Sequence, residues 1–416
     1  MTYELTSLAN GLRVATERVP TALSVATGAW VRVGARDEPA ELAGVSHFLE
    51  HLLFKGTAER SALDISRAVD RVGGDMNAFT TKEYTAYYNR LPATSFGVGL
   101  EILGDVLTAP AFREDEVDSE RQVILEELAM DDDNPDDVAF RLLAARLFAD
   151  HPLGRSTAGD RETIEAITTD QIRRFHDQWY RAENMVLAVV GPLGHDEVVA
   201  EVERCFSELS GGGRPPHRER PNGSSPGYHG EQDDTEQVHL CVGLRGVDRA
   251  DPDRDALDVV NHVLGGGMAS RLFEEIRERR GLAYTVYSGV TSYDDSGSLT
   301  IYAATQPAHA VEVAGLLSDC VAELVADGVT DDELDIARGY LSGSYVLGLE
   351  DTGARMGRLA SQLTTMGEVR PVEDQVARWQ SVGHDDVARV CQRILRDDRV
   401  TVALGPDVEH LGTHLV

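Results

Sequence analysis

The segment from residue 45 to residue 54 reads VSHFLEHLLF, and its polar side chains recur with the period of a helix. Each residue of an α-helix turns by about 100°, so that His47, Glu50 and His51 fall within an arc of roughly 100°. Aliphatic side chains cover the opposite side of the helix. The pattern predicts a helix with a buried back and an ionisable front.

Two imidazoles one helical turn apart, with a carboxylate beside them, are typical of a zinc site. Neutral imidazole nitrogens bind the ion, and the carboxylate can take a proton from a metal-bound water. The order here is H-x-x-E-H, the reverse of the more common H-E-x-x-H. The alternative is an amphipathic helix with two surface histidines. The fully apolar opposite face weakens that alternative, because a helix of this kind suits the lining of a cleft.

A catalytic zinc site needs a third protein ligand and one open position. Residues 114–128, EDEVDSERQVILEEL, supply the candidates around an apolar stripe centred on Ile124. Glu120 and Glu127 lie roughly 40–60° from that centre, whereas Glu126 points nearly the opposite way, at about 160°. A carboxylate beside an apolar stripe is costly unless it is paired or metal-bound. A pair of salt bridges at the rim of the stripe is the alternative reading.

Length, apolar content and net charge limit the classes of protein to which the chain can belong. The chain has 416 residues, of which 42% are hydrophobic, and a formal net charge of −32. This length predicts two or more domains, and the apolar content excludes wholesale disorder. The strong acidity argues against nucleic acid and against an anionic membrane surface as partners. It fits a basic substrate, or it reflects only solubility.

Cysteine usage and the N-terminus favour a cytoplasmic protein. The four cysteines stand far apart without a C-x-x-C pair, which excludes a cysteine-based zinc site and disfavours a disulfide framework. The first residues, MTYEL, contain no readable secretory signal. No apolar run approaches the roughly 18 to 20 residues that span a bilayer.

The chain is expected to divide into two domains, residues 1–210 and 235–416, joined by a linker at 211–234 that is rich in Gly, Pro and Ser. Strand-like and helix-like runs alternate throughout, which predicts an α/β or α+β fold of unreadable strand order. Residues 30–39 and 238–252 share an apolar strand, a Gly-x-Arg step and an acidic turn ending in Pro. This similarity indicates either an internal duplication or a coincidence between two ordinary units.

Four stretches resemble the inverzincin metallopeptidases of the pitrilysin and mitochondrial processing peptidase family, and most closely the bacterial members of half length. They are GVSHFLEHLLFKGT (Gly44–Thr57), GGDMNAFTTKEYTAYY (Gly73–Tyr88), DSERQVILEELAM (Asp118–Met130) and GGGMASRLFEEIRERRGLAYTVYS (Gly265–Ser288). The resemblance implies two similar domains in a clam-shell arrangement, each a mostly antiparallel sheet flanked by helices.

By this resemblance, His47, His51 and Glu127 would be the zinc ligands and Glu50 the general base. Glu120 would orient His51 from outside the ligand set. Glu127 lies 76 residues beyond His51, which fits the spacing of the family. The helical geometry already marked Glu127 as one of two candidates.

The resemblance also implies residues that hold the substrate. Asn77 and Ala78 would belong to an edge strand that pairs with the peptide backbone. The alternative for Asn77 is an ordinary turn residue after Gly74. Arg277 and Tyr284, in the second domain, would hold the substrate carbonyl and stabilise the oxyanion. Their alternative reading is a surface arginine and a strand tyrosine.

The function implied is a zinc-dependent endopeptidase that cleaves peptides or unfolded segments in an enclosed chamber. One Zn²⁺ per chain would activate the attacking water, and Glu50 would take its proton. We expect a homodimer, or a heterodimer with a homologous chain, and no nucleic acid or membrane partner. The alternative is a peptide-binding or structural subunit of a hetero-oligomeric processing peptidase.

Overall fold

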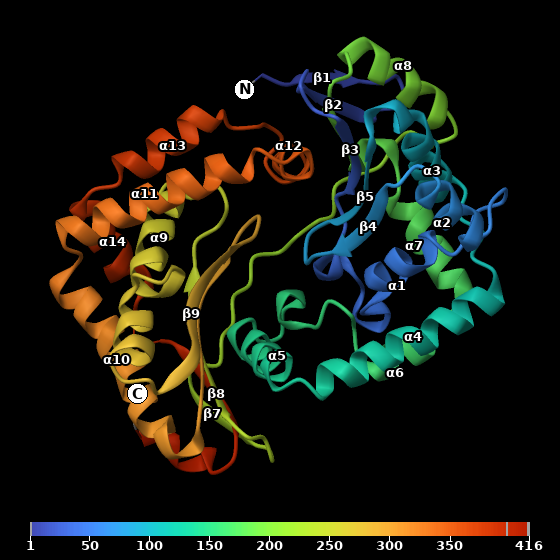
Figure 1. The fold of residues 1–416 in the computed structure, drawn as a ribbon. Helices are drawn as coiled ribbons and strands as arrows, with labels where there is room; N and C mark the ends of the chain where they lie inside the picture. The colour runs from blue at the N-terminus through green and yellow to red at the C-terminus, as the bar shows by residue number, and fades with distance from the viewer. Residues whose placement is uncertain (1, 397, 414–416) are drawn as a thin grey trace. The chain divides into compact units, whose positions relative to one another are not determined.

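The computed structural model describes residues 2–396 and 398–413, and its elements gather into two compact units, each a sheet with helices packed on it (Figure 1). Unit 1 comprises Met1–Ala129, Arg155–Arg218 and Val346–Val372. Unit 2 comprises Met130–Gly154, Glu219–Tyr345 and Glu373–Val416. The predicted fold class, two mostly antiparallel sheets flanked by helices, is confirmed.

Unit 1 is built on a six-stranded sheet of order β1-β2-β6-β3-β5-β4, in which only β2 and β6 run parallel. Strand β4 therefore lies at the edge of the sheet. The strands are β1 (Glu4–Ser7), β2 (Arg13–Arg18), β3 (Ser24–Val31), β4 (Asp75–Thr80), β5 (Thr85–Pro92) and β6 (Met185–Gly191).

Helices bury one face of this sheet in the main core of unit 1. They are α1 (Val45–Leu53), α2 (Ala62–Asp70), α3 (Phe96–Thr108), α4 (Glu114–Asp132), α6 (Arg161–Ala166), α7 (Thr169–Trp179) and α8 (His195–Cys205). Local sequence fixes their ends. Helix α2, for example, begins after Ser61, whose hydroxyl accepts a hydrogen bond from the Asp64 N–H. Gly73, with φ of 68°, follows the end of α2.

Unit 2 is built on a five-stranded sheet of order β7-β11-β8-β10-β9. Its strands are β7 (Gly227–Gln232), β8 (Val238–Gly246), β9 (Ala283–Ser292), β10 (Gly297–Thr305) and β11 (Val400–Gly405). Its helices include α9 (Arg254–Asn261), α10 (Ala310–Asp327), α11 (Asp331–Gly348), α13 (Val372–Ser381) and α14 (His384–Ile394).

Short helical turns complete both units. Two π-helical turns, His262–Gly266 and Phe273–Glu278, belong to unit 2. The 3-10 turns are Ala35–Asp37, Ala40–Leu42, Ala93–Ser95, Pro152–Gly154, Ala182–Asn184, Pro307–His309 and Val408–Thr413.

The strand patterns of the two sheets favour the internal duplication. In unit 2 the strands β7 and β11 form a parallel pair, as β2 and β6 do in unit 1. From this pair each sheet continues through antiparallel strands to an edge, which is β4 in unit 1 and β9 in unit 2. The two similar sequences at 30–39 and 238–252 begin in β3 and β8, which hold corresponding places. Coincidence explains this correspondence less well than duplication.

The units do not follow the predicted ranges 1–210, 211–234 and 235–416. Helix α5 (Pro135–Leu147) packs on β8 and β11 of unit 2, and α12 (Thr352–Thr365) packs on β3 and β6 of unit 1. Each half of the chain thus supplies one helix to the sheet of the other half. The expected linker also contains β7, whose pairing with the distant β11 is invisible in its Gly-rich composition.

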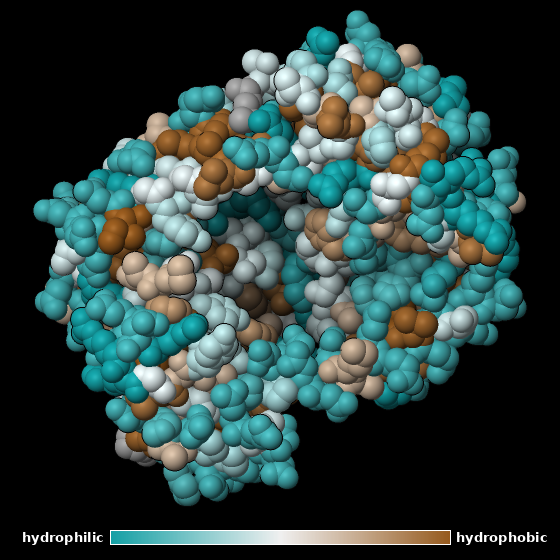
Figure 2. All heavy atoms as spheres, viewed as in Figure 1, coloured by the Kyte–Doolittle hydropathy of each residue, from teal (hydrophilic) through white to brown (hydrophobic). Residues whose placement is uncertain are grey.

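The visible surface is largely polar. The face drawn in Figure 2 is mostly hydrophilic, with apolar side chains in separate small patches. Among the described residues, no helix has both the length and the apolar character that crossing a bilayer requires.

A buried histidine gives the stability of unit 1 a defined dependence on pH. His176 on α7 bonds the carbonyl oxygen of Leu107 at 3.1 Å, and its ring stacks on Tyr180. Burial lowers the pKa of His176 to about 4. The unfolded chain takes up a proton near pH 6.5, whereas the folded chain resists it until about pH 4. The contribution of neutral His176 to the free energy of unfolding is therefore fully present above pH 6.5 and is lost as the pH falls toward 4.

We expect His176→Gln to reduce the loss of unfolding free energy between pH 7 and pH 5 by about 2 kcal/mol. Urea denaturation at the two pH values measures this difference. His217→Gln, at an exposed position, is the matched control. An equally steep loss in His176→Gln and in the wild type would contradict this account.

Candidate metal centre

Backbone geometry at Gly44 and a buried carboxylate fix the start of α1. Gly44 has φ of 92°, and an added Cβ would lie 2.5 Å from the Ala158 carbonyl oxygen, so that only glycine fits. The Glu38 carboxylate accepts hydrogen bonds from the N–H groups of Gly44 and Ser46, each at 2.7 Å. These bonds satisfy free donors at the N-terminus of the helix, where negative charge is favourable.

Helix α1 has the two faces that its sequence predicts. Its back is buried in the core of unit 1 through Val45, Phe48, Leu49, Leu52 and Leu53. His47, Glu50 and His51 are only partly buried and share the front. The buried back fixes the rotation of the helix and therefore the direction of the three polar side chains.

Helix α4 brings Glu127 to the two histidines. Its Oε2 atom lies 3.8 Å from Nε2 of His47 and 3.5 Å from Nε2 of His51. One donor atom from each of the three side chains lies within 4.8 Å of the others. Ligands about 2.0–2.1 Å from a tetrahedral zinc ion lie about 3.4 Å apart, so that small adjustments bring all three onto one ion.

The donor set suits zinc in its chemistry as well. Burial and the neighbouring His51 lower the pKa of His47 to about 4, so that this imidazole is neutral at pH 7. A neutral imidazole is the form that binds a metal. Two imidazoles and one carboxylate are a common ligand set of catalytic zinc, and they leave a fourth position for other ligands.

Glu120, the other candidate on α4, lies behind His51. Its Oε2 atom is 3.1 Å from Nδ1 of His51, and its Oε1 atom is 2.6 Å from Nζ of Lys55. Glu120 is buried, with 4% of its surface exposed. The Nδ1 contact leaves Nε2 of His51 facing Glu127, which is how a carboxylate outside the ligand set orients a metal-binding histidine.

Glu50 stands beside the cluster and is held by a residue that the sequence reasoning did not single out. Thr80, the last residue of β4, donates a 2.6 Å hydrogen bond from its hydroxyl to Oε2 of Glu50. Burial raises the pKa of Glu50, and the bond from Thr80 opposes that rise. Thr80 and Lys55 both lie within the stretches that carry the family resemblance, which is the one signal that points to them.

Asn77 and Ala78 lie in β4 at the free edge of the sheet. The alternative reading of Asn77 as a turn residue is therefore wrong. Its side-chain oxygen accepts a 2.8 Å hydrogen bond from the N–H of Ala78.

Arg277 and Tyr284 lie together in unit 2, at a π-helical turn and at the start of β9. The Arg277 guanidinium donates to the carbonyl oxygen of Tyr284 at 3.1 Å and lies over its ring, 4.5 Å from the centroid. Tyr284 is 77% exposed. The arginine thus holds a tyrosine whose ring faces solvent.

Comparison with known families accounts for most of the chain. The family model described as insulinase, peptidase family M16, matches residues 13–161, and that of the peptidase M16 inactive domain matches residues 166–341. The chain belongs to peptidase family M16. The first of these matches ends at residue 161, so that His47, His51 and Glu127 all lie within it.

Relatives and solved structures agree with this membership. The chain is 43% identical over 413 residues to an uncharacterized zinc protease of Streptomyces coelicolor, covering 97% of this chain and 90% of that protein. It is 35% identical over 401 residues to an uncharacterized zinc protease of Bacillus subtilis, covering 95% and 97%. A crystal structure of a peptidase M16 inactive domain from Pseudomonas fluorescens superposes with a TM-score of 0.92 at 26% identity, covering 98% of each chain.

Loss of the Glu120 carboxylate should weaken the metal centre without removing a ligand. We expect Glu120→Gln to lower zinc affinity by about 10- to 100-fold, because His51 loses its charged partner. Competition with a chromogenic chelator measures the affinity. Glu126→Gln, on the exposed side of the same helix, is the matched control. Equal zinc affinity in the two variants would remove the orienting role.

Proposed function

We propose that this protein is a zinc-dependent endopeptidase that hydrolyses peptides or unfolded segments. The observation that carries the proposal is the group of His47, His51 and Glu127 donor atoms within 4.8 Å, with the Glu50 carboxylate on the same helix face. The printed names of the relatives in Streptomyces coelicolor and Bacillus subtilis, both zinc proteases, support zinc as the metal.

The ligands would be His47, His51 and Glu127. When bound, zinc supplies a Lewis acid that polarises the scissile carbonyl and lowers the pKa of water. Glu50 takes the proton from the water that attacks the carbonyl carbon, and it returns this proton to the leaving amine as the C–N bond breaks. Burial raises the pKa of Glu50, which makes its carboxylate a stronger base for this exchange.

The remaining predicted residues bind the substrate. The free edge of β4, with Asn77 and Ala78, pairs with an extended peptide backbone, as an added strand does. Arg277 and the hydroxyl of Tyr284 donate hydrogen bonds to the oxygen that becomes negative in the transition state. Two chains form a homodimer that encloses a chamber, and the Arg277–Tyr284 pair of one subunit completes the zinc site of the other.

The second candidate function is a non-catalytic subunit that binds peptides beside an active homologue. The description of the second family model as an inactive domain favours it. That model begins at residue 166, after all four residues of the proposed chemistry. An intact set of ligands and base supports the catalytic function instead.

The role of Glu50 has a direct test. We expect Glu50→Gln to retain zinc and to lose about 10²- to 10⁴-fold in kcat for peptide cleavage, because the amide no longer accepts the proton. Zinc content and cleavage of a quenched fluorescent peptide are measured on the same preparation, with Glu126→Gln as the control. Undiminished cleavage by Glu50→Gln would overturn the mechanism.

Mixing of subunits tests the shared site. Glu50→Gln and Arg277→Ala chains, co-expressed with different tags, should each be inactive alone. Mixed dimers purified through both tags contain one complete site and should recover roughly half of the wild-type activity per dimer. A mixed dimer as inactive as its parents would show that Arg277 and Tyr284 do not act on the site of the other subunit. A purified protein that is monomeric would contradict the proposed homodimer.

A further inference from the structure

The two faces of β4 lead to different surroundings. Side chains alternate along a strand, so that Thr80 and Ala78 face the core side, where Thr80 meets Glu50. Asp75, Asn77 and Phe79 point to the opposite side, opposite Arg90, Tyr88 and Ala86 of β5. A peptide added to the free edge of β4 continues this alternation. Every second side chain of the peptide therefore projects to the face that carries Phe79.

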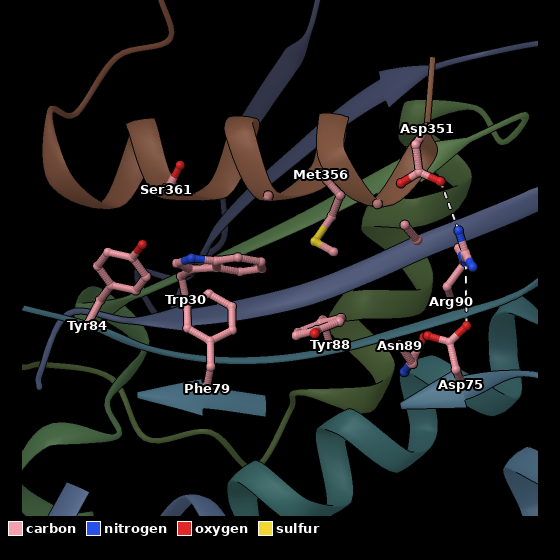
Figure 3. Close-up of a pocket in the computed structure, with 13 residues that line it drawn as sticks. Trp30, Asp75, Phe79, Tyr84, Tyr88, Asn89, Arg90, Asp351, Met356 and Ser361 are labelled. Carbon is pink, nitrogen blue, oxygen red and sulfur yellow. Dashed lines mark hydrogen bonds and ion pairs between the residues drawn. The ribbon is translucent and has the colours of Figure 1, made fainter. Parts of the chain in front are cut away.

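A cavity of about 460 Å³ lies on that face, between the sheet and α12. Figure 3 shows Met356 extending from α12 toward Trp30 and Tyr88, with Phe79 below Trp30 and beside Tyr88. Trp30 and Met356 are each 2% exposed and form the floor of the cavity, whereas Phe79 is 37% exposed at its mouth. The cavity belongs entirely to unit 1 and opens beside the edge strand.

The lining of the cavity is an aromatic cage. The Phe79 ring meets Trp30, Tyr84 and Tyr88 edge to face, with centroids 6.2, 6.0 and 6.1 Å apart. Rings arranged in this way offer edges and faces to a further ring, and the Met356 sulfur adds a favourable contact for an aromatic group. An aromatic occupant therefore gains more here than an aliphatic one of equal area.

The charged groups of the cavity are already paired at its rim. Arg90 lies between two carboxylates, 2.8 Å from Asp351 and 3.5 Å from Asp75, as the dashed lines in Figure 3 indicate. Because Arg90 and the two carboxylates partly neutralise one another, a charged side chain of the peptide would gain no ion pair inside the cavity and would lose its hydration.

Helix α12 leaves room for the occupant. Gly357 lines the cavity, and a Cβ built on it meets nothing within 4 Å. Glycine in a helix costs stability relative to alanine, so that an open glycine facing a cavity is not explained by packing. Gly28 in β3, by contrast, is required by packing. An added Cβ there would lie 2.4 Å from the Trp30 ring and 2.7 Å from the Met356 sulfur, so that only glycine leaves these two side chains in place.

We propose that this cavity is a subsite for an aromatic side chain of the bound peptide, presented from the strand added to β4. The inference rests on the proposed peptide hydrolysis and adds its selectivity. Phe79 and Tyr88 hold the ring at the mouth, Trp30 and Met356 form the floor, and Gly357 sets the depth.

The test uses quenched peptides that differ at one position, with alanine, phenylalanine or lysine placed there and the position moved along the peptide. For wild type we expect one position at which phenylalanine raises kcat/KM over alanine by roughly 10- to 100-fold, as burial of a large apolar side chain gives. Gly357→Leu should bring this ratio close to one, mainly through KM, and Gly357→Ala should lower it less. Gly339→Leu, at an exposed helical glycine with open space, is the matched control.

Phe79→Ala provides a second variant that does not insert a side chain into a helix. It removes one wall of the cage and should also lower the phenylalanine-to-alanine ratio. A wild type that shows no aromatic preference at any position, or that prefers lysine, would overturn the proposal. A preference that persists in both Gly357→Leu and Phe79→Ala would place the selectivity elsewhere and overturn it too.

Binding of the same peptides to Glu50→Gln separates this inference from the proposed function. Fluorescence anisotropy should give tighter binding of the phenylalanine peptide, and Gly357→Leu in the same background should abolish the difference. If the wild type cleaves no peptide while this binding pattern holds, the peptidase function fails and the subsite stands. If cleavage occurs without the pattern, the subsite fails and the peptidase stands.

Discussion

The metal centre depends on a buried carboxylate shared between two helices. Glu120 of α4 is almost fully buried, and it contacts both His51 and Lys55 near the end of α1. A buried carboxylate without partners is strongly unfavourable, so that α1 and α4 are held in the one register that supplies both contacts. Glu127 lies seven residues further along α4, close to two full turns, and therefore on the same side of the helix. The contact that satisfies Glu120 thus also sets Glu127 beside the two histidines.

In the part of unit 2 that the structure describes, the same order of strands and helices occurs without this donor set. Helices α9 and α11 follow β8 and β10 as α1 and α4 follow β3 and β5. At the end of α9 a single histidine, His262, stacks on Tyr340 of α11, with ring centroids 4.3 Å apart. An aromatic stack there joins the two helices where a carboxylate joins them in unit 1. The fold is therefore compatible with both arrangements, and the chemistry depends on the side chains that it carries.

The sequence predicted the parts of the site that follow from one helical period. The front of α1 and the choice of Glu120 and Glu127 over Glu126 need only the 100° turn and an apolar stripe, and both helices stand where expected. The link between Thr80 and Glu50 joins residues 30 positions apart through a strand register that no local pattern encodes. The exchange of α5 and α12 between the sheets was unpredictable for the same reason, since an amphipathic helix shows that it needs a sheet but not which one.

Strand β4 carries both Thr80, which contacts Glu50, and Phe79, which lines the aromatic cavity. Its pairing with β5 runs without a shift from Asp75, opposite Arg90, to Thr80, opposite Thr85. Because alternation has a period of two, a slip of one residue would turn Thr80 away from Glu50 and Phe79 away from the aromatic cavity at once. The backbone of a peptide bound at this edge would take its register from the same strand. The distance along the peptide between the bond that meets Glu50 and the side chain that enters the cavity is therefore fixed by the pleat of the sheet, and not by the contacts of either site alone.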